Sequence, residues 1–174
     1  MSKHIVLLRG VNVSGSNIIK MAELKQTLND TGFKDAVTYI QSGNIVLSSD
    51  KPKEEVSLEI HNLIKSKFDL DVPVITLSGS ELKKIKDSNP FKEVEDKCYF
   101  VFLFDQPLQV NCEKLAENSY PNEEYVIAED VIYLYPKLGA GKAKLNNNVL
   151  ENKLKVTATA RNLNTVNKLI ELAQ

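Results

Sequence analysis

The chain has 174 residues and a formal net charge of -1, with 43% hydrophobic and 26% charged residues. This composition is ordinary for a folded globular protein, and it gives the whole molecule no basic signature of nucleic-acid binding. No apolar run approaches the roughly 20 residues that cross a bilayer, so we expect no membrane partner. The apolar stretch Ile5–Leu8 is also too short for a signal-peptide core, which predicts a cytoplasmic protein.

Residues that commonly bind metals or act as nucleophiles are scarce. The two cysteines, Cys98 and Cys112, lie too far apart in sequence for a metal knuckle or a redox pair. In a reducing compartment they are expected to be small apolar residues rather than a disulfide. The two histidines, His4 and His61, fall in a strand and on a charged helix. We therefore predict no metal site and no cofactor.

Hydrophobic periodicity predicts six elements in the first half of the chain. Met21, Leu24 and Leu28 recur at helical spacing, and Gln41–Asn44 has the composition of a hairpin turn. In chain order we expect a strand at 4–9, a helix at 21–31, strands at 36–40 and 45–49, a helix at 52–68 and a strand at 72–77.

The same pattern recurs in the second half, after a short linking helix at 81–87 that Ser80 is expected to cap. Asn162 or Asn164 is the expected cap of the last helix. In chain order we predict a strand at 98–104, a helix at 110–118, strands at 124–128 and 131–135, a helix at 146–154, a strand at 156–160 and a helix at 165–173.

The order β-α-β-β-α-β therefore occurs twice. It predicts an α+β fold of two tandem ferredoxin-like (βαββαβ) halves with antiparallel sheets, plus a C-terminal helix. The first half covers residues 1–78, a linking helix and loop cover 79–97, and the second half with its C-terminal helix covers 98–174. The repeat is one of pattern, without recognisable sequence identity between the halves.

Positive charge is unevenly distributed along the chain. Residues 1–22 carry three basic residues and no acid, and residues 137–161 carry six basic residues against the single acid Glu151. A local basic excess is a better guide to an anionic ligand than the net charge. The alternative is that these lysines only form a solvated surface.

Three polar segments at strand ends or turns carry glycine, basic charge or both: 9–20, 39–44 and 157–165. Loops held by a rigid sheet are common places for binding groups. In the third, a strand ends at Arg161 where a helix begins, and free N–H groups there favour an anion to which arginine can add contacts. The alternatives are capping residues that pair with their own helix, arginines that pair with acids, and a simple hairpin turn at 39–44.

Two nucleotide-binding signatures fail on inspection. Gly139-Ala140-Gly141-Lys142 lacks the earlier glycine of a P-loop, because Pro136 stands there, and Ala143 replaces the hydroxyl residue that would bind magnesium. The alternating aromatic residues of 99–104 lack the interspersed basic residues and glycines of an RNA-binding sheet, which favours core packing.

The segments Leu8–Gly15, Tyr39–Asn44 and Ala158–Thr165 together resemble a bacterial family of uncharacterised proteins, domain of unknown function 1697. Its members read LLRGINVGG, YIQSGN and ATTRNWNT at these places, in this order. The resemblance implies two ferredoxin-like halves and brings no activity with it. It selects the following candidate ligand-binding residues: Arg9, Asn12, Gln41, Ser42, Asn44, Thr159, Arg161, Asn162 and Asn164. The chain departs from the family at Ser14, Ala160 and Leu163, where glycine, threonine and tryptophan are usual.

Three functional hypotheses remain. In the first, the protein binds a small anionic or phosphate-bearing ligand in a cleft lined by Arg9 and Arg161. In the second, it is a metal-independent enzyme on an anionic substrate, which requires a titratable group with a perturbed pKa. In the third, it is a protein- or nucleic-acid-interaction module that uses a sheet face or the basic segment 137–161.

Overall fold

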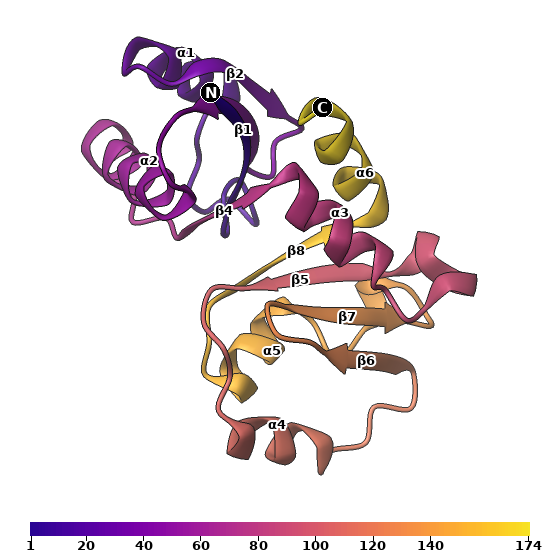
Figure 1. Ribbon diagram of the computed structural model, residues 1–174. Helices are drawn as coiled ribbons and strands as arrows, with labels where there is room; N and C mark the ends of the chain where they lie inside the picture. Colours follow the sequence, from indigo (N-terminus) through magenta and orange to yellow (C-terminus); the bar gives the residue numbers. More distant parts are fainter. The chain divides into compact units, whose positions relative to one another are not determined.

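The computed structural model describes all residues, 1–174. It is an α+β structure with two four-stranded antiparallel sheets, one in each of two compact units (Figure 1). The first unit comprises Met1–Lys84 and Asn167–Gln174, and the second comprises Ile85–Val166. The unit boundaries fall inside two helices, α3 (Gly79–Asp87) and α6 (Leu163–Leu172).

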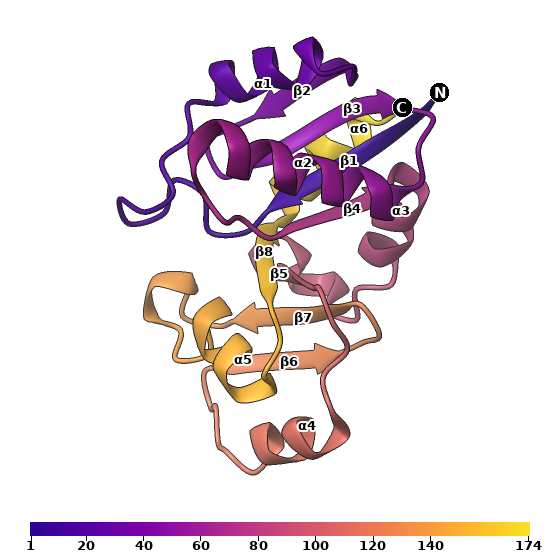
Figure 2. The same ribbon diagram turned by 90° about the vertical axis from the view of Figure 1, so that its left-hand side faces the viewer.

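The sheet of the first unit has the strand order β2-β3-β1-β4, and every neighbouring pair is antiparallel. Its strands are β1 (Ser2–Leu8), β2 (Lys34–Tyr39), β3 (Asn44–Ser49) and β4 (Val74–Ser78). Two helices, α1 (Met21–Asp30) and α2 (Lys53–Phe68), connect them. Side chains of both helices pack in one core cluster with β1 and β3, and Figure 2 shows the ribbon of α2 in front of the strands.

The main core of the first unit lies between this face and the two helices. Val6 and Leu8 of β1 are fully buried there, together with Leu24 of α1 and Ile60 of α2. On the other face, the last residues of α6 lie close to the sheet, because the Lys3 ammonium donates to the Leu172 carbonyl at 3.0 Å. Both faces of this sheet are therefore covered, which explains why β1 reads as a continuous apolar run.

The second unit repeats this strand order as β6-β7-β5-β8. Its strands are β5 (Tyr99–Leu103), β6 (Glu123–Ile127), β7 (Val131–Pro136) and β8 (Ala158–Asn162), all in antiparallel pairs. The helices are α4 (Gln109–Ala116) and α5 (Asn147–Leu154), with two short 3-10 helices, η1 (Lys92–Lys97) and η2 (Ala140–Lys142). In Figure 1, α4 and α5 lie on the same side of this sheet.

Successive side chains of β5 point to opposite faces of the sheet, and both faces are buried at this strand. Val101 packs with residues of α4 and α5, including Leu115 and Leu150. Phe100 faces the other way and makes an edge-to-face contact with Tyr133, with ring centroids 5.9 Å apart. The aromatic residues Phe100 and Phe102 are fully buried, so their alternation reflects core packing, as predicted.

Three local expectations need correction. Ser78, not Ser80, caps α3: its hydroxyl accepts from the Glu81 N–H at 3.1 Å, and its own N–H donates to the Glu81 carboxylate at 2.7 Å. This reciprocal pair is a capping box. Strand β8 continues to Asn162 and passes directly into α6, although the strand was expected to end at residue 160. Ile40 was expected in a strand but adopts a left-handed conformation with φ 50°.

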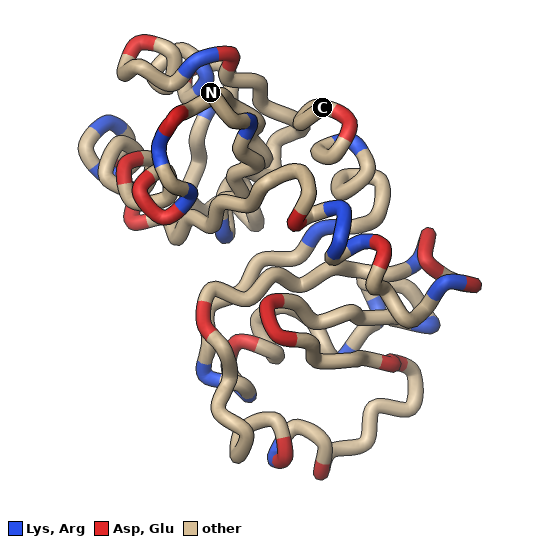
Figure 3. The backbone as a smooth tube through the Cα atoms, in the orientation of Figure 1, with Lys and Arg blue, Asp and Glu red and all other residues tan.

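Charge is mixed along both units. Figure 3 shows acidic and basic positions close together along α2, and Lys51 bridges to Glu59 within that region. The basic segment 137–161 is partly neutralised, because Lys137 pairs with Glu124 of β6 at 2.8 Å. No helix of the structure is both long enough and apolar enough to cross a membrane.

Candidate functional site

The first two motifs meet in the first unit through one amide. The Asn12 Nδ2 group donates to the carbonyls of Ile19 at 2.9 Å and Gln41 at 2.8 Å, and its Oδ1 atom accepts from the Ile19 N–H at 2.9 Å. Asn12 therefore ties the loop after β1 to the hairpin between β2 and β3. Since its donors and acceptor already have partners, this side chain serves the loop structure.

The hairpin itself uses two further residues of the second motif. Asn44 is fully buried, and its Nδ2 group donates to the Tyr39 carbonyl at 3.1 Å and to the Ser42 hydroxyl at 2.9 Å. Gly43 has φ 74°, and a Cβ atom there would lie 2.6 Å from the Cβ of Leu8. The motif therefore encodes a tight turn against β1, while the Gln41 side chain remains exposed.

The backbone of the same hairpin is strained. Ile40 has φ 50° and is half exposed, and a β-branched side chain disfavours this left-handed region. Such outliers cost on the order of 1–3 kcal/mol each and persist where surrounding bonds fix them. The bonds from Asn12 and Asn44 on either side of Ile40 supply that constraint.

The two motif arginines belong to different units. Arg9 follows β1 in the first unit, where its N–H donates to the Pro73 carbonyl at 3.0 Å and its side chain is half-buried. Arg161 lies in β8 of the second unit. A cleft lined by both arginines stays a prediction.

Arg161 is a buried cation on the face of its sheet that carries Phe100, its direct partner across β5. Its Nη1 atom donates to the Thr159 hydroxyl at 2.7 Å and to the Ala160 carbonyl at 2.8 Å. Burial lowers the pKa of the Arg161 guanidinium from its usual range to about 10. The group therefore remains charged at neutral pH, and residues of its own strand help to solvate it.

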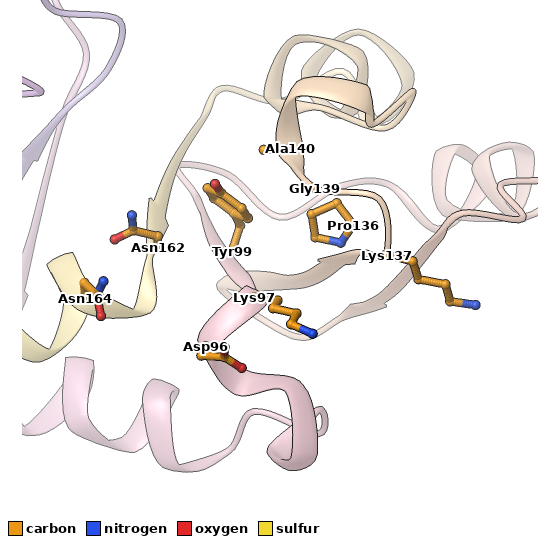
Figure 4. Close-up of a pocket in the computed structure, with 9 residues that line it drawn as sticks. All are labelled: Asp96, Lys97, Tyr99, Pro136, Lys137, Gly139, Ala140, Asn162 and Asn164. Atoms are coloured by element: carbon orange, nitrogen blue, oxygen red, sulfur yellow. The ribbon is translucent and has the colours of Figure 1, made fainter.

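The next two residues of interest, Asn162 and Asn164, border a cavity of about 280 Å³ within the second unit (Figure 4). Asn162 lies directly opposite Tyr99 on the neighbouring strand, so the amide and the ring share one face of the sheet. Pro136 at the end of β7 completes this wall. The backbone of Gly139 and Ala140 lines another side of the cavity.

Charged residues at the cavity come from η1 and from the turn after β7. Asp96 and Lys97 line it, and neither makes an ion pair within the chain. Lys137 also lines it but pairs with Glu124, and this partner raises the pKa of the Lys137 ammonium. Lys137 therefore stays a cation at neutral pH and is unsuited to act as a general base.

Several polar groups at this cavity have hydrogen-bonding capacity to spare. The Asn162 Oδ1 atom accepts from the Thr165 N–H at 2.9 Å, which confirms Asn162 as a cap of α6 and leaves its Nδ2 group for other partners. The Tyr99 hydroxyl and the exposed Asn164 amide make no hydrogen bond within the chain. This differs from Asn12 and Asn44, whose amides are committed to their own loops.

The nine predicted residues thus separate into four groups. Asn12, Ser42 and Asn44 stabilise loops of the first unit, Thr159 and Arg161 are buried in β8, and Asn162 and Asn164 line the cavity. Gln41 and Arg9 lie near the loop after β1. Sequence reasoning missed the other residues that line the cavity, among them Lys97 at the end of η1 and Tyr99, which the pairing of β5 with β8 places opposite Asn162.

Comparison with known sequences decides the family. A family model described as "Protein of unknown function (DUF1697)" matches residues 1–133. The chain belongs to the DUF1697 family. The match confirms the resemblance seen in the motifs at 8–15 and 39–44, and it ends before the third motif of this DUF1697 protein.

A solved structure has the same fold. It is described as "the structure of conserved bacterial protein SP0830 from Streptococcus pneumoniae", and it is 22% identical to this DUF1697 protein with a TM-score of 0.79 over 99% of each chain. At this identity the likeness concerns the fold alone. A search of curated proteins found no match.

The structure offers little for metal or thiol chemistry. No group of three or more His, Cys, Asp or Glu side chains is arranged to hold a metal ion. Cys98 and Cys112 are free thiols, as predicted, and burial raises the pKa of the Cys98 thiol. A thiol with a raised pKa is a poor nucleophile at neutral pH, which identifies Cys98 as a packing residue.

Proposed function

We propose that this DUF1697 protein binds a small anionic ligand in the cavity of its second unit. The observation that carries the proposal is the convergence of Lys97, Asn162 and Asn164 on one hollow, each with unused hydrogen-bonding capacity. The ammonium of Lys97 supplies a positive charge without an internal partner. The three side chains come from η1, β8 and α6, and a few polar groups that converge on one hollow are a common arrangement for ligand binding.

The charges around the cavity favour a weakly charged anion. Two cations, Lys97 and Lys137, line the cavity. Their charge is offset by Asp96, which also lines the cavity, and by Glu124, which forms an ion pair with Lys137. The first N–H groups of α6, which begins at Leu163 beside Asn162, add a fixed partial positive charge. A monophosphate or a carboxylate suits this balance better than a polyphosphate does.

We also propose a fold subtype and a cellular location for the protein. Strand orders β2-β3-β1-β4 and β6-β7-β5-β8, each with two connecting helices, support two tandem ferredoxin-like halves. The cytoplasm remains the proposed location, and the free thiols of Cys98 and Cys112 are consistent with a reducing compartment.

A thermal-shift screen of the full chain tests the binding proposal. The panel holds inorganic phosphate, sugar phosphates, nucleoside monophosphates and dicarboxylates at low and moderate salt. A ligand at about 100 times its Kd adds roughly 2.7 kcal/mol of apparent stability. We expect Lys97→Ala to abolish the shift and Lys142→Ala to preserve it, because Lys142 is exposed nearby without lining the cavity.

Arginine variants distinguish this site from the cleft predicted by the sequence. If Arg9→Ala abolishes the shift and Lys97→Ala does not, the ligand binds at the arginines and the cavity proposal is wrong. Arg161→Ala removes a buried group, so its effect is read beside the stability of the unliganded variant. A complete absence of shifts in wild-type protein would also overturn the proposal.

A further inference from the structure

We infer that the ligand of this cavity is a mononucleotide, with its base against the ring of Tyr99 and its phosphate at Lys97. The inference rests on the proposed function, because it names the ligand class of the same cavity. It depends on the wall chemistry, which combines the Tyr99 ring, the unused Nδ2 group of Asn162, the free amide of Asn164 and the ammonium of Lys97.

Tyr99 gives the cavity a flat aromatic wall. It is the first residue of β5, and the strand register places its side chain on the same face as Asn162. The neighbouring aromatic residues Phe100 and Phe102 are fully buried, whereas Tyr99 is only partly buried. A base stacked on such a ring gains from about fivefold to about a hundredfold in affinity.

Space beside the ring is available for a planar group. Gly139 borders the cavity, and a Cβ atom there would meet no atom within 4 Å, so the backbone faces open space. In Figure 4, Tyr99 lies between Asn162 and Pro136, with Ala140 on the adjoining wall. We place the heterocycle of the ligand in this open space, along the exposed part of the Tyr99 ring.

The two asparagines suit the edge of a base. The Asn162 Nδ2 group can donate, and the free amide of Asn164 can both donate and accept. Side-chain amides match the paired donors and acceptors on heterocycle edges. The volume of about 280 Å³ is near the lower end for small-molecule sites, which fits one nucleotide rather than a strand.

The test titrates the full chain with each of the four nucleoside monophosphates, with ribose 5-phosphate and with inorganic phosphate, by calorimetry and by proton NMR. We expect at least one nucleotide to bind tenfold or more tightly than ribose 5-phosphate. Its base protons should shift upfield, because a stacked aromatic ring shields them. Tyr99→Leu should weaken nucleotide binding by about tenfold, whereas Tyr99→Phe keeps the ring and the affinity.

Three other outcomes would contradict the nucleotide inference. If ribose 5-phosphate and phosphate bind as tightly as every nucleotide, an anion site exists and the nucleotide inference is wrong. If nucleotides bind but Tyr99→Leu behaves as Tyr99→Phe, the ring is not the stacking surface and the inference again fails. If no compound binds, both the inference and the proposed anion site are wrong.

Discussion

Replacement of Gly43 by alanine should strongly destabilise the first unit. The added Cβ atom would lie 2.6 Å from the Cβ of Leu8, a fully buried residue of β1. The Leu8 N–H donates to the Gly43 carbonyl at 2.8 Å, so the two segments cannot separate without losing that bond. Gly43 also has φ 74°, a region that alanine disfavours.

The magnitude follows from two separate costs. The left-handed conformation costs an alanine about 1–2 kcal/mol. Overpacking against a core strand costs about 1–3 kcal/mol more, because Leu8 has to move. We therefore expect Gly43→Ala to lower the free energy of unfolding by about 2–5 kcal/mol, a large share of the ~5–15 kcal/mol typical of a folded protein.

Gly15→Ala is the matched control. Gly15 has φ 77°, almost the same as Gly43, but a Cβ atom there would meet nothing within 4 Å. Both residues belong to the first unit, so urea unfolding followed by circular dichroism reports the same transition for each variant. Gly15→Ala should lose only the conformational cost of about 1–2 kcal/mol. Equal losses for the two variants would refute the steric argument.

Three further predictions concern a loop amide, a capping carboxylate and the two thiols. Asn12→Ala should lower the free energy of unfolding by about 2–4 kcal/mol because three hydrogen bonds are lost, whereas Asn17→Ala, which loses one, should cost about 1 kcal/mol in the same urea assay. Burial alone would raise the pKa of the Glu81 carboxyl, but hydrogen bonds from Lys53 and Ser78 lower it overall. The ionised Glu81 carboxylate therefore stabilises the fold above about pH 4.5, and this stabilisation is lost as the pH falls. The stability difference between wild type and Glu81→Gln should therefore shrink from about pH 6 to about pH 3. A thiol reagent should modify the half-buried Cys112 well before the buried Cys98, and faster labelling of Cys98 would contradict its assignment to the core.

Periodicity was sufficient to predict the order of helices and strands, because each element buries one recurrent apolar stripe. Helix α2, with Val56, Ile60 and Ile64 inward, is an example that ends at the expected Phe68. Boundaries failed where one residue has two roles. Asn162 is both the last residue of β8 and the side chain that caps α6, so no loop sequence separates strand from helix.

The candidate site was only partly predictable for a different reason. Asn162 and Asn164 could be selected because they match the third family motif and because asparagine is a common helix cap. Tyr99 and Lys97 precede them by more than sixty residues in sequence and join them only through the register of β5 against β8. Register is a property of the folded sheet, and no local pattern in either segment specifies the partner.

The first unit is built from two separate segments of the chain, and this has a consequence for its synthesis. Its sheet needs residues Asn167–Gln174, which the ribosome adds only after the whole of Ile85–Val166. The covering contact between Lys3 and Leu172 joins almost the earliest and the latest parts of the chain. Domains generally fold in the order in which they emerge. In this protein the N-terminal unit is complete only after translation has passed through the second unit, because its last eight residues are made at the end.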